Sequence, residues 1–130
     1  MKFTADRYDV PIVTGYGPDW IAVDGERIDD SVLISSLGAR EAWNCAAFEQ
    51  LEAQHFETLQ RFGVELVIFG SGLRQRFPHP QWLAGLYRER IGVETMDTRA
   101  ACRTYNILAG EGRKVLLAAL IERVAPPGSP

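Results

Sequence analysis

The chain has 130 residues, with 14 lysines and arginines against 17 aspartates and glutamates, so its formal net charge is −3. These values fit one soluble globular domain and give no overall attraction for nucleic acid or an anionic membrane. No run approaches the roughly 18 apolar residues of a membrane-spanning helix, and the first residues lack the apolar core of a secretory signal. We therefore expect a cytoplasmic protein that neither inserts into a membrane nor binds nucleic acid.

The first third of the chain has the pattern of antiparallel β-structure. Apolar and polar residues alternate up to Thr14, the segment 15–19 interrupts this pattern, and residues 20–23 resume it. Asp24-Gly25 is a strong hairpin signal, because a type I′ turn needs positive φ at both central positions. The pattern after this turn predicts two more strands, at residues 26–29 and 31–35.

The period then changes to that of a helix. The predicted apolar face consists of Phe48, Leu51, His55, Leu59 and Phe62. Gly63 is a suitable helix end, and the nearly continuous apolar run at residues 64–69 predicts a central strand covered on both faces.

The remaining segments alternate between helix and strand. Pro80 begins a predicted helix that runs through Tyr87, and residues 91–96 form a strand. Asp97-Thr98 supplies the N-cap of a third helix that ends near Gly110 or Gly112, and the short segment 114–121 is assigned as a strand. We expect one α/β domain over residues 1–124 with a partly parallel central sheet, and a disordered C-terminal tail at 125–130.

A series of short motifs runs through the second half of the chain. In order they are Gly70-Ser71-Gly72, Phe77-Pro78, Asp97-Thr98, Ala101 with Thr104-Tyr105-Asn106, and Glu111-Gly112-Arg113 before an alanine- and leucine-rich segment. Their order and spacing resemble the Mth-type domain family, a group of small bacterial and archaeal proteins labelled as of unknown function. Eukaryotic relatives of this family include a mitochondrial assembly factor for respiratory complex I and an adipogenesis-associated protein. The similarity extends from about Tyr8 to Arg123.

This resemblance implies both a fold and a kind of function. The implied fold has three layers, with a mixed central sheet, helices on one side and an additional antiparallel β layer from the N-terminal part. The resemblance does not imply a catalytic activity, and we expect no cofactor. It favours an interaction or assembly-type module whose partner is another protein.

The loop at Gly70, Ser71 and Gly72 is the first candidate site, because ligands of open α/β sheets bind where a strand ends. Glycines allow close backbone approach, and Arg74 and Arg76 supply charge for a phosphate or carboxylate. However, the glycine spacing matches neither a dinucleotide fingerprint nor a P-loop, and no helix N-terminus is expected to face this loop. The simplest interpretation is that these glycines serve the turn.

Tyr105 and Asn106 form the second candidate site, on a helical stripe with Cys102 and Ala109. An asparagine inside a helix usually has a hydrogen-bonding role. That role is either to tie the helix to a neighbouring loop, such as the Gly70 loop, or to present an amide to a ligand. We favour the structural role.

The cysteines and histidines form no recognisable catalytic or metal-binding pattern. Cys45 and Cys102 are too few and too far apart for a disulfide framework or a zinc site, and neither histidine has metal-ligand spacing to another ligand. We expect reduced thiols and no metal site. A triad of Cys102, His55 and Asn106 is rejected, because only the residue types support it. Arg113 is expected to pair across the turn before the last strand.

Two function classes remain. The first is a non-enzymatic interaction or assembly-type module, which is a monomer or a weak homo-oligomer and uses exposed aromatic residues around Trp43, Phe77 and Trp82. The alternative is a binder of, or enzyme acting on, a small anionic ligand at the Gly70–Gly72 loop. Nucleic-acid binding would require the arginines at 88, 90, 99 and 103 to cluster, against the acidic balance of the chain.

Overall fold

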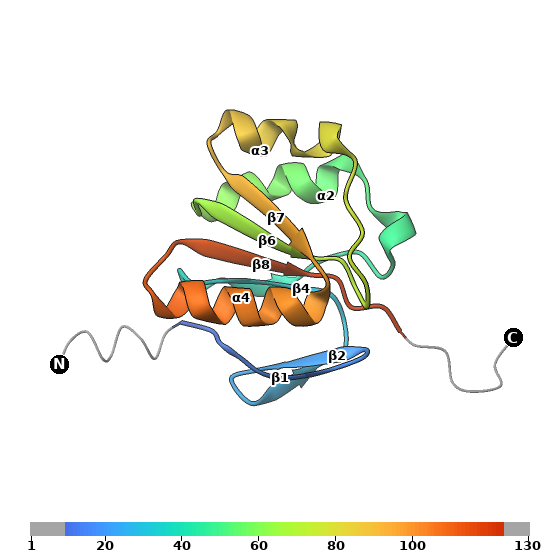
Figure 1. Ribbon diagram of the computed structural model, residues 1–130, viewed down its shortest axis with the longest axis vertical. Helices are drawn as coiled ribbons and strands as arrows, with labels where there is room; N and C mark the ends of the chain where they lie inside the picture. The colour runs from blue at the N-terminus through green and yellow to red at the C-terminus, as the bar shows by residue number, and fades with distance from the viewer. Residues whose placement is uncertain (1–9, 124–130) are drawn as a thin grey trace, which may run out of the picture.

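The computed structural model describes residues 10–123, and this part of the chain forms two β-sheets (Figure 1). Sheet A is antiparallel, with the strand order β1 (Val13–Gly17), β2 (Trp20–Val23) and β3 (Glu26–Ile28). Sheet B has the order β5 (Arg40–Ala42), β4 (Val32–Ser35), β8 (Val115–Ala119), β6 (Leu66–Gly70) and β7 (Gly92–Met96). β6 is parallel to both β7 and β8, whereas β4 is antiparallel to its two neighbours. The α/β class, the mixed central sheet and the separate antiparallel sheet are confirmed.

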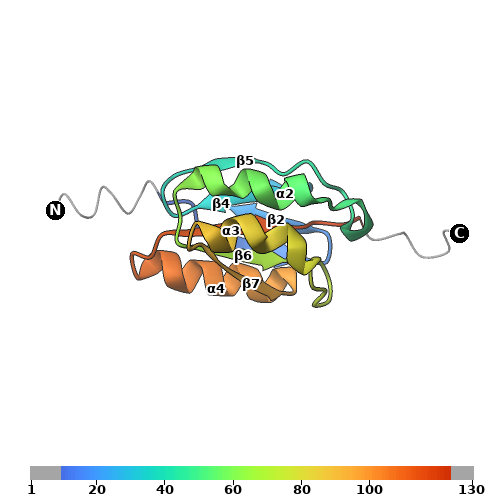
Figure 2. The same ribbon diagram turned by 90° about the horizontal axis from the view of Figure 1, so that it is seen from above.

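The helices divide between the two faces of sheet B, which corrects the expectation that they lie on one side. The first face carries η1 (Phe48–Gln50), α2 (Ala53–Glu57), η2 (Thr58–Phe62), η3 (Pro80–Leu83) and α3 (Ala84–Arg88). The longest helix, α4 (Thr98–Gly110), lies on the opposite face beside sheet A (Figure 2). The β6–α4 side therefore has its own hydrophobic core.

The physical reason for two cores is the apolar character of the central strands on both faces. On β6, Val67 and Phe69 pack towards α2 and α3, whereas Ile68 packs towards α4. β8 repeats this alternation, with Leu116 on the first side and Leu117 on the second. A continuous apolar run with two covered faces is the arrangement predicted for residues 64–69.

The core below α2 and α3 is aromatic. Trp43, Phe56 and Phe69 meet edge to face, with ring centroids 5.3–5.8 Å apart. The predicted helix over residues 48–62 is divided into the 3₁₀-helix η1, the short α-helix α2, which begins at Ala53, and the 3₁₀-helix η2. As a result Phe56, rather than His55, occupies the centre of the buried face.

His55 instead closes the N-terminus of α2. Its Nδ1 accepts a hydrogen bond from the Glu52 backbone N–H at 2.9 Å, and its Nε2 lies 2.9 Å from the Asn44 carbonyl oxygen. The predicted position of this histidine at the centre of an apolar face was therefore wrong. Its polar ring atoms are used in capping the helix.

The N-terminal hairpins agree with the turn chemistry. Asp24 and Gly25 have φ values of 51° and 85°, as a type I′ turn between β2 and β3 requires. The interruption predicted at residues 15–19 is shorter in the structure, because residues 15–17 pair with residues 20–22 and extend β1 as far as Gly17. A bulge lies between Val13 and Gly15.

The C-terminal elements match their predictions. The Asp97 carboxylate accepts a hydrogen bond from the Ala100 N–H at 2.9 Å, which makes Asp97 the N-cap of α4. The segment assigned as a strand after Gly112 is β8. The tail predicted at 125–130 lies outside the described residues. None of the helices within residues 10–123 is long and apolar enough to cross a membrane.

Candidate functional site

The loop after β6 crosses the N-terminus of α4. The Gly72 N–H donates to Thr98 Oγ1 at 2.9 Å, and the Thr98 N–H donates to the Gly72 carbonyl at 2.8 Å. This corrects the expectation that no helix N-terminus faces the loop. Because β7 is the parallel neighbour of β6, the helix that follows β7 begins at the same edge of the sheet.

The polar groups at the start of this loop are paired within the protein. The Ser71 N–H donates to the Met96 carbonyl at 2.9 Å, and Ser71 Oγ accepts from the Arg76 N–H at 2.8 Å while donating to the Arg74 carbonyl at 2.8 Å. The backbone N–H groups of Ser71 and Gly72 are the donors that an anion would need, and both already have partners. The side chain of Arg74 is exposed.

Arg76 holds the loop in place. Its guanidinium donates to the Ser71 carbonyl from Nε at 3.1 Å and from Nη2 at 2.7 Å, and it forms an ion pair with Glu122. It also stacks over the Phe48 ring, 4.6 Å from the centroid, and Glu122 accepts from the Phe48 N–H at 2.7 Å. We call residues 71–76, held by Arg76 and Glu122, the braced loop.

Glycine is required at position 72 for two reasons. Its φ of +102° is strained for any residue with a side chain. An added Cβ would also lie 2.5 Å from Arg76 Nη2 and 2.8 Å from Glu122 Oε1. The interpretation that these glycines serve the turn is consistent with this geometry.

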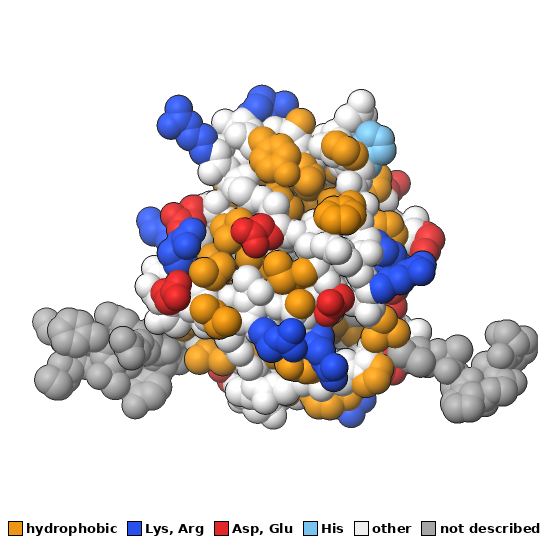
Figure 3. Space-filling model, in the orientation of Figure 1, with side chains coloured by type: hydrophobic (Ala, Val, Ile, Leu, Met, Phe, Trp, Pro, Cys, Tyr) orange, Lys and Arg blue, Asp and Glu red, His pale blue; other side chains and the backbone are white. Residues whose placement is uncertain are grey.

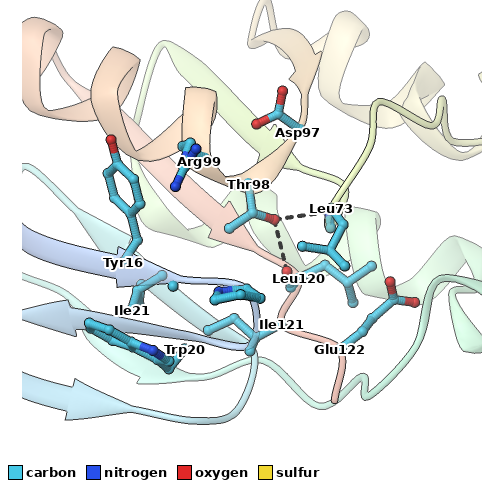
Figure 4. Close-up of a pocket in the computed structure, with 13 residues that line it drawn as sticks. Tyr16, Trp20, Ile21, Leu73, Asp97, Thr98, Arg99, Leu120, Ile121 and Glu122 are labelled. Atoms are coloured by element: carbon cyan, nitrogen blue, oxygen red, sulfur yellow. Dashed lines mark hydrogen bonds between the residues drawn. The ribbon is translucent and has the colours of Figure 1, made fainter. Parts of the chain in front are cut away.

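A cavity of about 410 Å³ lies between the braced loop, the first turn of α4 and the β1–β2 hairpin (Figure 4). Tyr16 and Trp20 form aromatic walls, and the Arg99 guanidinium lies over the Tyr16 ring, 5.0 Å from its centroid. The Thr98 hydroxyl donates to the Leu120 carbonyl at 2.8 Å. The cavity therefore offers aromatic surface with a single guanidinium at its rim.

Leu73 separates this cavity from a second, more open hollow of about 530 Å³. Leu73, Ile121 and Glu122 line both, and the second hollow is completed by residues around Ala47 and Arg76. Leu73 is 65% exposed, although it is carried by a loop that hydrogen bonds hold in place. We call Leu73 and the two hollows beside it the Leu73 surface.

The Tyr105–Asn106 stripe serves a structural purpose. The Asn106 side-chain amide accepts from the Val13 N–H at 3.0 Å and donates to the Val13 carbonyl at 2.8 Å. The Tyr105 hydroxyl donates to the Pro11 carbonyl at 2.7 Å, and its ring is fully buried. These residues join α4 to the start of β1, and not to the Gly70 loop as suggested from the sequence.

The other predicted site residues do not gather at one place. Arg113 forms an exposed ion pair with Glu65, whose pKa is lowered by this hydrogen bond, at the opposite end of β6 from Gly70. The proposed aromatic surface is not formed, because Trp43 is in the core and Trp82 stacks on Phe56. Of that group only Phe77 is largely exposed.

The two cysteines and the arginines are also dispersed. Cys45 packs in the α2–α3 core and Cys102 in the α4 core, so the sheet separates them. His55, on the side of Cys45, is therefore remote from Cys102. Arg99 and Arg103 contact Tyr16, whereas Arg88 ends α3. Acidic and basic side chains are interspersed in Figure 3. The described residues contain no group of three potential metal ligands.

The sequence interpretation missed the roles of several residues that shape this region. Arg76 and Arg74 were considered together, and only the fold decides which one reaches Glu122. Thr98 was recognised as a helix start but not as a neighbour of Gly72. One feature of the sequence could have drawn attention to Leu73, because it is a large apolar residue inside a predicted loop.

Comparison with known proteins places this fold in a family. Residues 13–121 match the family described as "Protein of unknown function (DUF498/DUF598)". A crystal structure of a Bordetella parapertussis protein has a TM-score of 0.81 at 33% identity, covering 86% of this chain and 96% of that one. The solution structure of a Bordetella pertussis protein, described as a Mth938-like domain, has a TM-score of 0.75 at 28% identity, covering 87% of each chain.

A curated relative with a named role is the NADH dehydrogenase (ubiquinone) 1 alpha subcomplex assembly factor 3 of Bos taurus. It is 35% identical over 118 residues, which is 89% of this chain. This chain spans 61% of the bovine protein and 45% of its Mus musculus counterpart. Together with the family match, these similarities confirm the resemblance to the Mth-type domain: the chain belongs to the DUF498 family of proteins of unknown function.

Proposed function

We propose that this protein is a non-enzymatic interaction module that assists the assembly of another protein complex, and that the Leu73 surface contacts its partner. The observation that carries this proposal is the exposure of Leu73 between two hollows on a braced loop. A large apolar side chain held out in water costs free energy that is recovered when a partner covers it. The bracing reduces the ordering cost of binding.

The chemistry of the cavity supports a binding role. Of the carboxylates beside it, Asp97 caps α4, and Glu122 is held by Arg76 and by the Phe48 N–H. The cavity has aromatic walls from Tyr16 and Trp20, which suit an apolar or aromatic side chain of a partner. The alternative of a small anionic ligand at the Gly70–Gly72 loop is disfavoured, because the backbone donors of Ser71 and Gly72 are already used.

The relatives support the kind of partner. The bovine and mouse relatives are named as NADH dehydrogenase assembly factors, so NADH dehydrogenase subunits are the first partners to test for this chain. We retain the other expectations as part of the proposal: a cytoplasmic protein, a monomer or weak homo-oligomer, and no binding to nucleic acid. Burial of the two cysteines on opposite sides of sheet B fits reduced thiols.

Affinity capture with matched variants tests this proposal. The tagged full chain, Leu73→Ser and Ile107→Ser are each crosslinked mildly in lysate of the source cell, and the captured proteins are quantified by mass spectrometry. Ile107 is a suitable control because it is 61% exposed and lies nine positions after Thr98 on α4. We expect Leu73→Ser to reduce capture of the specific partner about tenfold, the effect of losing an interface anchor.

Two results would contradict the proposal. If no protein is enriched over untagged lysate, the interaction role itself fails. If the wild type, Leu73→Ser and Ile107→Ser capture the same protein equally, a partner exists but the Leu73 surface is not its contact. Circular dichroism of each variant, with an unchanged thermal midpoint, excludes unfolding as the cause of lost capture.

A further inference from the structure

The two edges of sheet B differ in their protection. β5, at one edge, is three residues long, and its charged side chains are held by neighbouring elements: Arg40 lies 2.9 Å from Glu26, and Glu41 pairs with Arg61. Short strands and fixed charges are common ways to block an edge against further pairing. β7, at the other edge, is five residues long and pairs only with β6 among the described strands (Figure 1).

Two of the five residues of β7 turn their backbone groups away from the sheet. The Gly92 N–H donates to the Glu65 carbonyl, and the Met96 carbonyl accepts from the Ser71 N–H, so residues 92, 94 and 96 bond to β6. In a parallel ladder the intervening residues turn their N–H and C=O groups to the opposite side. Val93 and Thr95 therefore present the open edge.

A side chain already occupies part of the place of the next strand. The Gln75 amide donates to the Thr95 carbonyl at 2.9 Å, as the backbone N–H of an added strand would. No other hydrogen bond to the outward groups of Val93 and Thr95 is formed within residues 10–123. Gln75 is exposed, so an incoming strand can displace its side chain without disturbing the core.

Charge on this strand indicates the chemistry of the segment it accepts. Glu94 lies at the centre of β7, beside Ile68 of β6, and is exposed. It forms no ion pair with any of the described residues. Opposite charges on directly facing residues stabilise a strand pair, and like charges destabilise it.

We propose that the edge of β7 binds an extended segment of a partner protein as a sixth strand of sheet B, with a lysine or arginine facing Glu94. The juxtaposition that supports this is an open five-residue edge with an unpaired carboxylate at its centre. The inference deepens the proposed interaction role, on which it rests, but it stands on backbone geometry separate from the Leu73 surface. Strand addition is a recurrent way in which proteins recognise peptides.

The same charge argues against a second copy of this chain as the occupant. Two β7 strands paired antiparallel over their full length would place Glu94 directly opposite Glu94 of the second copy. That arrangement places like charges about 5 Å apart between their Cβ atoms and is destabilising. A partner segment with a basic residue has no such cost.

A displayed peptide library tests the inference without a cellular partner. Random 12-residue peptides on phage are selected on the immobilised full chain, and enriched peptides are synthesised and measured by fluorescence anisotropy. We expect alternating sequences with lysine or arginine at one fixed position. Bound peptide should slow amide hydrogen exchange at Val93 and Thr95 about tenfold or more, with exchange in β5 unchanged.

Three variants sharpen the result. Thr95→Pro removes an outward N–H and leaves the bonds to β6, so it should weaken binding about tenfold while the protein stays folded. Glu94→Lys should reverse the preference towards peptides with glutamate at the fixed position, whereas Glu94→Gln should only reduce it.

Several results would overturn the inference. The selection could enrich no peptide, or the enriched peptides could lack a preferred lysine or arginine. Amide hydrogen exchange at Val93 and Thr95 could also stay unchanged when a peptide is bound. A concentration-dependent dimer that Thr95→Pro dissociates, seen by sedimentation equilibrium, would assign the edge to a second copy instead. Because the probe is a peptide library, failure of the lysate capture leaves this test intact, and failure here leaves the Leu73 surface untouched.

Discussion

The two regions singled out from the sequence, the Tyr105–Asn106 stripe and the Gly70 loop, differ in which atoms remain free. In the stripe, the polar atoms of both side chains are bonded to the backbone at the start of β1. In the loop, the polar groups of Ser71 and Gly72 are likewise bonded, but Leu73 is left in solvent. The difference teaches that the polar groups of a distinctive motif can all be bonded within the fold, while an apolar residue of a nearby loop stays exposed.

The largest effect should come from removing the buried ring of the stripe. Tyr105→Ala deletes a side chain with no exposed area and should lower the free energy of unfolding by about 3–5 kcal/mol. Tyr105→Phe keeps the ring and removes only the hydrogen bond to Pro11, which should cost about 1–2 kcal/mol. Urea denaturation measures both. Equal losses in the two variants would show that the hydroxyl, rather than packing, dominates.

Asn106→Ala should have the next largest effect. It leaves the Val13 N–H and C=O without their partner, and we expect a loss of about 2–3 kcal/mol. Ile107→Ala, at the next position but exposed, should change stability by less than about 0.5 kcal/mol. Urea denaturation of the two variants measures their free energies of unfolding. Hydrogen exchange at the Val13 amide should accelerate only in Asn106→Ala. If Asn106→Ala lost less stability than Ile107→Ala, the Asn106 amide would have no structural role.

Gly70→Ala tests how closely the loop and α4 approach each other. An added Cβ would lie 2.9 Å from Thr98 Cα and 3.1 Å from Ala101 Cβ, and backbone atoms cannot move aside cheaply. We expect a loss of about 1–3 kcal/mol. Gly110→Ala is the control: nothing lies within 4 Å of its Cβ, and it should stabilise α4 by up to about 1 kcal/mol. Thermal unfolding separates the two, and matching midpoints would contradict the close contact.

Alkaline pH should weaken the α4 side of the protein. Burial raises the pKa of the Cys102 thiol to about 12 from its ordinary value of 9.0, and burial also raises the pKa of Tyr105. Between these pH values the thiol ionises in the unfolded chain but not in the folded one, so its stabilising contribution is complete below about pH 9 and is lost as the pH rises towards 12. The loss from Cys102 should be about 1 kcal/mol at pH 10.

Urea denaturation at pH 8, 9 and 10 measures this slope, and Cys102→Ala provides the control. The variant should lose less stability between pH 9 and 10 than the wild type does, because its remaining alkaline sensitivity at this side comes from Tyr105. Parallel curves for the two proteins would mean that Cys102 does not titrate differently in the folded and unfolded states.

The smallest stability effect should come from the side chain most important for the proposed interaction. Leu73→Ser removes an exposed group, and the free energy of unfolding should change by less than about 0.5 kcal/mol. Differential scanning calorimetry checks this. A loss above about 1 kcal/mol would place Leu73 in the packing of the loop and weaken the case for a partner contact.

Local signals in the sequence were sufficient for most secondary structure. The Asp24-Gly25 turn, the Asp97 cap and the apolar run ending at Phe69 each depend on neighbouring residues, and each was predicted at its observed place. The predictions that failed depended on continuity over longer stretches. The helix expected over residues 48–62 breaks before Ala53, which moves Phe56 into the core in place of His55.

The candidate site was predictable only in part, for a related reason. That the Gly70 loop lies at a strand end follows from its pattern, and the stripe on α4 follows from helical spacing. Whether Asn106 serves a ligand or Val13, and whether Arg74 or Arg76 reaches Glu122, depends on residues 93 and 46 positions apart. No local pattern carries that information.

By itself, the sequence determined the α/β class, the burial of the central strands on both faces and the chemistry of the turns, because hydrophobic period and backbone preference act over a few residues. Only the tertiary structure decided that α4 begins at the Gly70 loop, that Leu73 remains exposed and that β7 forms an open edge. These features depend on which distant segments meet, since the order of strands in a sheet sets which groups are covered and which are left for a partner.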